Sequence, residues 1–135
     1  MRDNWIYFGV FLPTISQEFN LQMLERNGIE IPYGWKIYNH HMTIAFNDKT
    51  ERSQKLYDSY SKYFGKQVKL VIDGIGFSDD ALALRVAYNE PIANKIPHIT
   101  IATPQNGKPV NSNRIKKWID IKPYGIVGKI QEFAK

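Results

Sequence analysis

One short pattern occurs twice in this chain, and each copy opens a run of apolar residues. Residues 41–45 read His-Met-Thr-Ile-Ala, and residues 98–102 read His-Ile-Thr-Ile-Ala. From ordinary residue frequencies, a single His-x-Thr arises by chance in roughly one chain in ten of this length. Two copies that both continue into Ile-Ala are rarer than about one in a thousand by the same arithmetic. We therefore predict that these two pentads form strands of one fold and share a site.

The alternation of side chains along a strand would give each pentad one polar face. The histidine, the threonine and the alanine of a pentad point to the same side when the strand is regular. In the first copy, Met42, Ile44 and Phe46 then point into the core. In the second copy, Ile99 and Ile101 do the same. Two such polar faces side by side would surround a phosphate with two imidazoles and two hydroxyls.

These side chains are suited to cleaving an RNA-type phosphodiester without a metal. One neutral histidine would take a proton from the attacking water or ribose hydroxyl, while a protonated histidine would donate one to the leaving oxygen. Imidazole suits both tasks because its unperturbed pKa is about 6.5. The threonine hydroxyls would stabilise charge on the non-bridging oxygens. We predict that His41 and His98 are catalytic, that Thr43 and Thr100 bind phosphate, and that activity is bell-shaped in pH and survives EDTA.

Composition narrows the class of protein. At 135 residues the chain is long enough for one domain, residues 1–135, but short for two. A formal charge of +5 favours a polyanionic partner, such as RNA or a small nucleotide. Three histidines without any cysteine make a zinc cluster improbable, so neither a metal nor a cofactor is expected. We find no membrane-length apolar run and no signal peptide, and so expect a cytoplasmic protein without an obligate protein partner.

Hydrophobic periodicity predicts a mixture of strands and helices. The expected strands cover residues 5–12, 41–46, 67–77, 81–88 and 98–102, and the expected helices cover 14–26, a segment ending near 64, and 112–119. Residues 121–133 should add one or two strands, interrupted by Pro123. Thr14 and Gln17 have the spacing of a helix capping box, and Trp5 should share a strand face with Tyr7. The mixture indicates an α+β fold, and the 57-residue interval between His41 and His98 suggests two lobes of antiparallel sheet plus helix.

Further residues are predicted to contact the substrate on weaker grounds. Five of the six are aromatic, and four of these could stack on a base, while an arginine between two alanines could reach a phosphate; the six are Tyr7, Phe11, Tyr33, Trp35, Arg85 and Tyr124. Each also has a simpler interpretation as a core or surface residue. His40 should point away from His41 if the strand is regular, and so lie on the rim or serve the structure.

The two histidine-threonine motifs, each in an apolar strand of a small α+β chain, resemble those of the two-histidine (2H) phosphoesterase superfamily. The resemblance covers most of the chain, although the interval between the motifs is short for that superfamily. It implies a compact bilobal fold in which each lobe contributes one motif to a central cleft. It also implies catalytic roles for His41 and His98, with phosphate binding by Thr43 and Thr100.

The motifs do not identify the substrate. Members of the superfamily include cyclic phosphodiesterases of RNA end repair, tRNA-ligase domains, 2′-5′ oligoadenylate phosphodiesterases, and phage anti-defence enzymes that degrade cyclic oligonucleotide signals. The main hypothesis is hydrolysis of 2′,3′-cyclic phosphate ends or of a small oligonucleotide, which includes a viral enzyme acting on immune signals. The alternative is a non-catalytic module that binds RNA or a nucleotide in the same cleft. Replacing His41 or His98 by alanine would separate the two, because a binder would keep its function.

Overall fold

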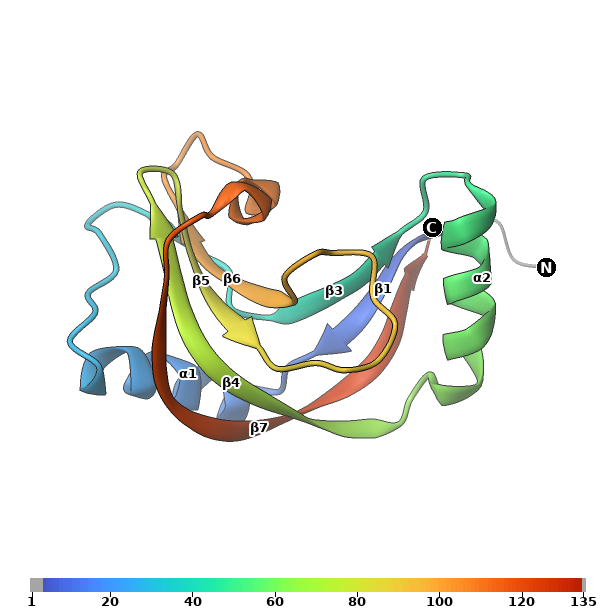
Figure 1. Cartoon of the computed structure of the whole chain (residues 1–135), viewed down its shortest axis with the longest axis horizontal. Helices are drawn as coiled ribbons and strands as arrows, with labels where there is room; N and C mark the ends of the chain where they lie inside the picture. Colours follow the sequence, from blue (N-terminus) through green and yellow to red (C-terminus); the bar gives the residue numbers. More distant parts are fainter. Residues whose placement is uncertain (1–3, 135) are drawn as a thin grey trace.

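The computed structural model describes residues 4–134, which form a seven-stranded antiparallel sheet with two α-helices and two short 3₁₀ helices (Figure 1). In chain order the elements are β1 (Trp5–Phe11), α1 (Thr14–Arg26), β2 (Lys36–Ile37), β3 (His41–Phe46), α2 (Glu51–Tyr60), η1 (Ser61–Tyr63), β4 (Gln67–Ser78), β5 (Ala81–Val86), β6 (His98–Thr103), η2 (Pro109–Arg114) and β7 (Trp118–Ala134). The predicted mixture of helices with an antiparallel sheet is confirmed.

The sheet is bent into a trough with two arms. Its strand order is β2-β6-β5-β4-β7-β1-β3, and the long strands β4 and β7 run through the bend (Figure 1). One arm carries β5 and β6, and the other carries β1 and β3. The two pentads, which begin β3 and β6, therefore belong to opposite arms of one continuous sheet.

A single chain segment joins the two edges of this sheet. The short edge strand β2 pairs with β6, and the backbone N–H groups of Tyr38 and Asn39 continue this pairing to Ile101 and Thr100 at 2.7 and 2.9 Å. Asn39 then adopts a positive φ of 55°, which turns the chain into β3 on the other edge. Asparagine tolerates this left-handed conformation better than most residues. The turn brings the first pentad next to the second, although β3 and β6 are not paired as neighbours in the sheet.

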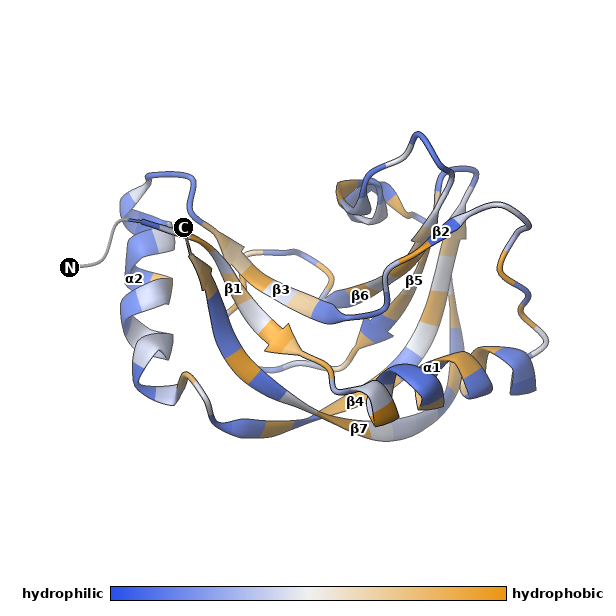
Figure 2. Ribbon diagram, turned by 180° about the vertical axis from the view of Figure 1, so that it is seen from behind, coloured by the Kyte–Doolittle hydropathy of each residue, from blue (hydrophilic) through white to orange (hydrophobic). Residues whose placement is uncertain are grey.

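The core lies between the sheet and the outer helices. Figure 2 shows hydrophobic and hydrophilic residues alternating along the C-terminal part of β7, as one buried face requires. Helix α2 stands outside the β1–β3 arm, where Tyr57 stacks on Trp5 at 4.7 Å between ring centroids. Its first turn is capped by Thr50, whose side chain accepts from the Ser53 N–H. Apolar burial of this kind anchors β1 and β3 and so holds the first pentad in place.

Helix α1 is held by polar contacts on its buried face. Its buried residues include Ser16 and Asn20, and the Ser16 hydroxyl donates to the Val127 carbonyl at 2.7 Å. The Asn20 side chain donates to Asn39 Oδ1 at 3.0 Å, while the Asn39 amide donates to the Gln17 carbonyl at 2.8 Å. Buried polar groups need such partners. The helix therefore fixes the turn at Asn39 that leads into the first pentad.

Two of the predicted helix features are wrong. The capping box of Thr14 and Gln17 does not form, because the N-cap is Pro13 and the Gln17 side chain donates to the Leu12 carbonyl instead. The expected helix over 112–119 is replaced by η2, which ends at Arg114, and Trp118 already belongs to β7. Trp118 pairs with Gly76, so pairing with β4 displaces the helical conformation there.

The first and last strands, β1 and β7, both depart from regular pairing. The C-terminal segment is one strand rather than two, and Pro123 falls where the β4–β7 register shifts, so its missing N–H interrupts no regular pairing. Trp5 does not share a face with Tyr7, because the β1–β7 register shifts between them and Trp5 is buried against Phe8.

Within residues 4–134, none of the helices has the length and apolar character needed to cross a bilayer.

Candidate functional site

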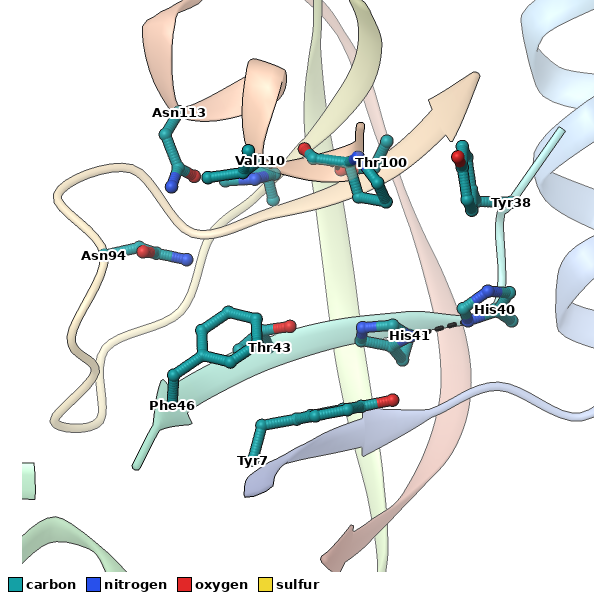
Figure 3. A pocket seen from close by; sticks show the side chains of 12 residues that line it. Tyr7, Tyr38, His40, His41, Thr43, Phe46, Asn94, Thr100, Val110 and Asn113 are labelled. Carbon is teal, nitrogen blue, oxygen red and sulfur yellow. Dashed lines mark hydrogen bonds between the residues drawn. The ribbon is translucent and has the colours of Figure 1, made fainter. Parts of the chain in front are cut away.

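Both pentads contribute to one pocket between the arms of the sheet. His41 and Thr43 enter it from β3, and Thr100 enters it from β6 (Figure 3). His98, at the start of β6, also lines it. The cavity has a volume of about 230 Å³ and is lined by Tyr7, Tyr38, His40, His41, Thr43, Phe46, Asn94, His98, Thr100, Pro109, Val110 and Asn113. The structure thus brings together the four side chains that the sequence singles out.

The first pentad follows the expected alternation only at its start. Met42 and Ile44 are fully buried, so His41 and Thr43 face the pocket as predicted. Phe46, predicted to point into the core, is instead exposed and lines the pocket beside Tyr7, with which it is paired across β1 and β3. The β1–β3 register shifts between Phe8 and Gly9, which reverses the face of the residues that follow.

Gly9 allows this close approach of the two strands. A Cβ atom at Gly9 would lie only 2.1 Å from the Met42 carbonyl oxygen, a distance that no side chain could tolerate. Gly9 is paired with Thr43, so the absence of a side chain here also leaves Thr43 uncovered from the side of β1.

His41 packs against two aromatic rings. Tyr7 and Phe11 both come from β1 and stack on the imidazole, with centroids at 5.1 and 5.3 Å (Figure 3 shows Tyr7 beneath His41). The predicted base-stacking residue Tyr7 lines the pocket, whereas Phe11 supports His41 and does not line it. Burial, together with the neighbouring His40, lowers the pKa of His41 from 6.5 to about 4. His41 is therefore neutral at ordinary pH.

His40 also lines the pocket, contrary to the alternation that would point it away. The strand begins at His41, after the turn at Asn39, so the alternation of β3 does not extend back to His40. Its Nδ1 lies 2.6 Å from Nδ1 of His41, and the two rings stack at 4.6 Å (Figure 3). Burial lowers the pKa of His40 as well.

His98 has a different partner and is more deeply enclosed. Its Nδ1 lies 2.8 Å from the carbonyl oxygen of Ile96. A carbonyl can only accept, so His98 Nδ1 carries a hydrogen and Nε2 is the nitrogen left for a substrate. Burial lowers the pKa of His98, and the bond to the Ile96 carbonyl opposes that lowering because it favours the protonated ring.

Thr100 is held by the segment that follows β6. Its hydroxyl lies 2.8 Å from the Ser112 hydroxyl and 3.2 Å from the Pro109 carbonyl, both in η2. Ser112 is itself buried. Thr43 has no comparable side-chain partner among residues 4–134. The two threonines thus differ in how firmly the protein orients them.

The remaining predicted substrate contacts lie outside the pocket lining. Tyr33 is fully exposed on its turn, and Trp35 packs against the main hydrophobic core. The Tyr124 hydroxyl donates to Asn20 Oδ1 at 2.8 Å and belongs to the polar contacts of α1, where burial raises its pKa. Substrate binding by these three residues stays a prediction, and the contacts seen here are structural.

Arg85 does not reach the pocket, although its position on the strand suggested contact with a phosphate. It is paired with His98 across β5 and β6, and so starts next to the pocket. Its side chain instead lies over Gly74, where a Cβ atom would come within 2.7 Å of the guanidinium carbon. It donates to Asp73 at 2.7 Å and to Asp120 at 2.6 Å, on the two strands beyond. The guanidinium is thereby directed away from His98.

The other residues around the pocket were not predicted from the sequence. Tyr38 and His40 come from the turn before β3, Asn113 and Val110 from η2, and Asn94 from the loop before β6. That loop crosses to the opposite arm, where the Ala93 N–H donates to the Ile44 carbonyl at 2.9 Å. Such contacts depend on tertiary structure, and only the adjacency of His40 to His41 could have indicated one of them.

No group of three or more metal-ligating side chains is assembled within residues 4–134. A neutral imidazole, a second imidazole with a carbonyl-bound Nδ1–H, and two hydroxyls can together transfer protons and donate hydrogen bonds to one anionic group.

Comparison with known proteins places this geometry in a family. Residues 23–132 match the fungal tRNA ligase phosphodiesterase domain. The chain belongs to this family. The match includes both pentads, all of β2 to β6 and most of β7, and the family is of the 2H phosphoesterase type. No curated protein matches the chain.

Proposed function

We propose that this protein is a phosphodiesterase that hydrolyses 2′,3′-cyclic phosphate ends of RNA. The proposal rests on one observation above all: His41, Thr43, His98 and Thr100 converge on a single cavity from opposite arms of the sheet. The family supports a phosphodiesterase acting on RNA, since its description names a phosphodiesterase domain of tRNA ligase. The two arms would then act as the two lobes of a 2H fold, each supplying one motif.

In the proposed reaction, His41 is the general base and His98 is the general acid. His41 Nε2 takes a proton from a water molecule, and the water oxygen forms a bond to phosphorus. The bond from phosphorus to one ribose oxygen breaks, and His98 donates its Nε2 proton to that oxygen. The product is a phosphomonoester beside a free hydroxyl, and the two protons balance. The lowered pKa of His41 supports its role as base, and the Ile96 carbonyl supports His98 as acid.

The threonine hydroxyls are proposed to hold the non-bridging oxygens, where negative charge develops in the transition state. Thr43 reaches the pocket from β3 and Thr100 from β6, so they can grip one phosphate from two sides. Thr100 already has partners in η2, and a phosphate oxygen would compete with the Pro109 carbonyl for its hydrogen.

The pocket favours a diester over a monoester. Its lining residues include no lysine or arginine, so the charge that faces a phosphate is a single imidazolium. A cyclic phosphodiester carries one negative charge, whereas a terminal monoester carries about 1.5 to 2 at pH 7. The cavity of about 230 Å³ is smaller than the ~300–1,000 Å³ typical of sites for drug-sized ligands. Both features favour binding of the terminal cyclic phosphate of an RNA. They also favour release of the more highly charged monoester product.

A product assay by mass spectrometry tests the proposal. The substrates are a nucleoside 2′,3′-cyclic phosphate, an RNA oligonucleotide with a cyclic end, a 2′-5′ oligoadenylate and a cyclic dinucleotide, each with EDTA or with Mg²⁺. We expect turnover of the cyclic ends, with a mass gain of one water and no dependence on metal. If only the 2′-5′ oligoadenylate and the cyclic dinucleotide were cleaved, the substrate would be a signalling nucleotide and not an RNA end. Tight binding without turnover of any substrate would make the protein a nucleotide-binding module instead.

A further inference from the structure

His40 contacts His41 at the ring nitrogen that determines which tautomer His41 adopts. Its Nδ1 is 2.6 Å from His41 Nδ1, and the rings stack at an angle of 28° (Figure 3). The backbone at His40 is fixed because its carbonyl accepts from the Leu12 N–H at 2.8 Å. Its ring also packs edge to face with the Tyr38 ring, with 6.1 Å between the centroids. The ring of His40 is thus supported from two sides while its outer edge faces solvent.

A hydrogen bond between two Nδ1 atoms requires one hydrogen, and its position decides what His41 can do. If His41 donates, its neutral ring carries hydrogen on Nδ1, and Nε2 has a lone pair that can accept a proton. If His40 donates, the neutral His41 ring must carry its hydrogen on Nε2, which then cannot act as a base. Only the first arrangement gives a working general base at Nε2.

The first arrangement is also the one that tolerates proton transfer. After His41 accepts a proton on Nε2, both of its nitrogens carry hydrogen, and Nδ1–H still points at a lone pair on His40. In the second arrangement the two Nδ1 atoms would both carry hydrogen at 2.6 Å, which is repulsive. In the first arrangement, His40 accepts the hydrogen bond at Nδ1 and carries its own hydrogen on Nε2. This assignment needs no movement of either ring during the reaction.

We propose that His40 is a positioning residue, which accepts a hydrogen bond from His41 Nδ1 and thereby leaves His41 Nε2 free to act as the base. The proposal rests on the proposed function for its catalytic meaning, but the tautomer itself is a property of the free protein. It gives the first pentad a counterpart to the Ile96 carbonyl, which does the same for His98.

Three substitutions separate hydrogen bonding from bulk. His40→Asn keeps an amide oxygen near the position of Nδ1, so it can still accept from His41. His40→Gln has the same chemistry, but its oxygen lies one bond further out, near the position of Nε2. His40→Ala removes the acceptor. Because His40 is exposed and its backbone bond to Leu12 is retained, all three variants should fold.

The direct readout is the ¹⁵N NMR spectrum of His41 in the free protein, above the pKa of both histidines. We expect hydrogen on Nδ1 in the wild type and in His40→Asn, and a shift toward hydrogen on Nε2 in His40→Ala and His40→Gln. An unchanged His41 tautomer in His40→Ala would overturn the proposal. This measurement needs no substrate, so it decides the proposal even if the assay for cyclic phosphate hydrolysis fails.

The kinetic readout is kcat/KM against pH on the cyclic substrate. We expect His40→Ala and His40→Gln to lose about 10- to 100-fold, as partners of functional histidines typically do, and His40→Asn to recover most of that loss. The titratable neighbours of His41 are His40, Tyr7 and, across the pocket, His98. Since His40 contributes to the low pKa of His41, its removal should move the acid limb to higher pH. Equal losses in the Asn, Gln and Ala variants, with an unmoved acid limb, would show a merely structural role.

Discussion

The two pentads differ far more in their surroundings than in their residues. β3 is an edge strand, and His41 rests on the rings of Tyr7 and Phe11. β6 lies between β2 and β5, and His98 is only 8% exposed. His41 Nδ1 meets another imidazole, whereas His98 Nδ1 meets a carbonyl. Equal motifs thus acquire unequal chemistry from the atom that faces each Nδ1.

The same contrast holds for the threonines. Thr100 is oriented by Ser112 and Pro109 in η2, while Thr43 lies next to Gly9. The second pentad is therefore the more rigidly built half of the site. The first depends on the turn at Asn39, which α1 holds through Asn20. If this structural asymmetry is also functional, substitutions in the two pentads should have different effects.

The largest effects are expected from the histidines. His41→Ala and His98→Ala should each lower kcat by about 10²–10⁴-fold on a cyclic phosphate, the usual contribution of a positioned acid or base. A nucleoside 4-nitrophenyl phosphodiester distinguishes the roles, because nitrophenolate leaves without needing a proton. On that substrate His98→Ala should recover most of its rate, while His41→Ala should not. Recovery by His41→Ala alone would reverse the assignment of base and acid.

The threonines should produce the next largest effects and should differ in stability. Thr43→Val and Thr100→Val each remove one donor to the phosphate, and such a loss typically costs about 10²–10³-fold in kcat. Thr100→Val also leaves the buried Ser112 hydroxyl without its Thr100 partner, at a cost of about 1–3 kcal/mol in the free energy of unfolding. Thermal denaturation should therefore show a lower Tm for Thr100→Val and an unchanged Tm for Thr43→Val. Equal Tm values would mean that η2 does not orient Thr100.

Strand periodicity was sufficient to predict the centre of this site. Met42, Ile44, Ile99 and Ile101 are buried as expected, so the histidines and threonines between them had to face the other way. The hairpin of β4 and β5 was also predictable, since the polar residues Asp79 and Asp80 separate two apolar runs. These features depend on local pattern, which a sequence carries directly.

The rim of the site could not be predicted, because it depends on contacts between distant residues. Phe46 faces the pocket through a register shift, and His40 does so through the positive φ of Asn39. Arg85 leaves the pocket because Gly74 and two aspartates, distant in sequence, provide a better place for its charge. Trp118 is drawn into β7 by its pairing with Gly76. Tertiary pairing overrides local propensity in each case.

The pH dependence of kcat/KM should show both halves of the comparison. The rate falls at low pH when His41 is protonated, and this limb should lie near its pKa of about 4. It falls at high pH when His98 loses its proton, and this limb should lie below 6.5 because burial lowers the pKa of His98. Activity should change by about tenfold per pH unit beyond either limb. Loss of the alkaline limb in His98→Ala would sharpen the assignment, and a plateau through pH 8 in the wild type would contradict it.

The smallest effect is expected from Arg85, which separates a structural cation from a catalytic one. Its guanidinium is engaged by Asp73 and Asp120 and lies over Gly74, so Arg85→Gln should leave KM and kcat close to the wild type. The ion pairs are partly exposed, and such pairs contribute roughly 0–1 kcal/mol to stability. Gly74→Ala is the matched variant, because its Cβ atom would displace the guanidinium without removing the charge. If Arg85 instead swings to the phosphate when substrate binds, Arg85→Gln will raise KM and Gly74→Ala will not. Equal and near-normal kinetics in both variants would leave the pocket with the imidazolium as its main source of positive charge.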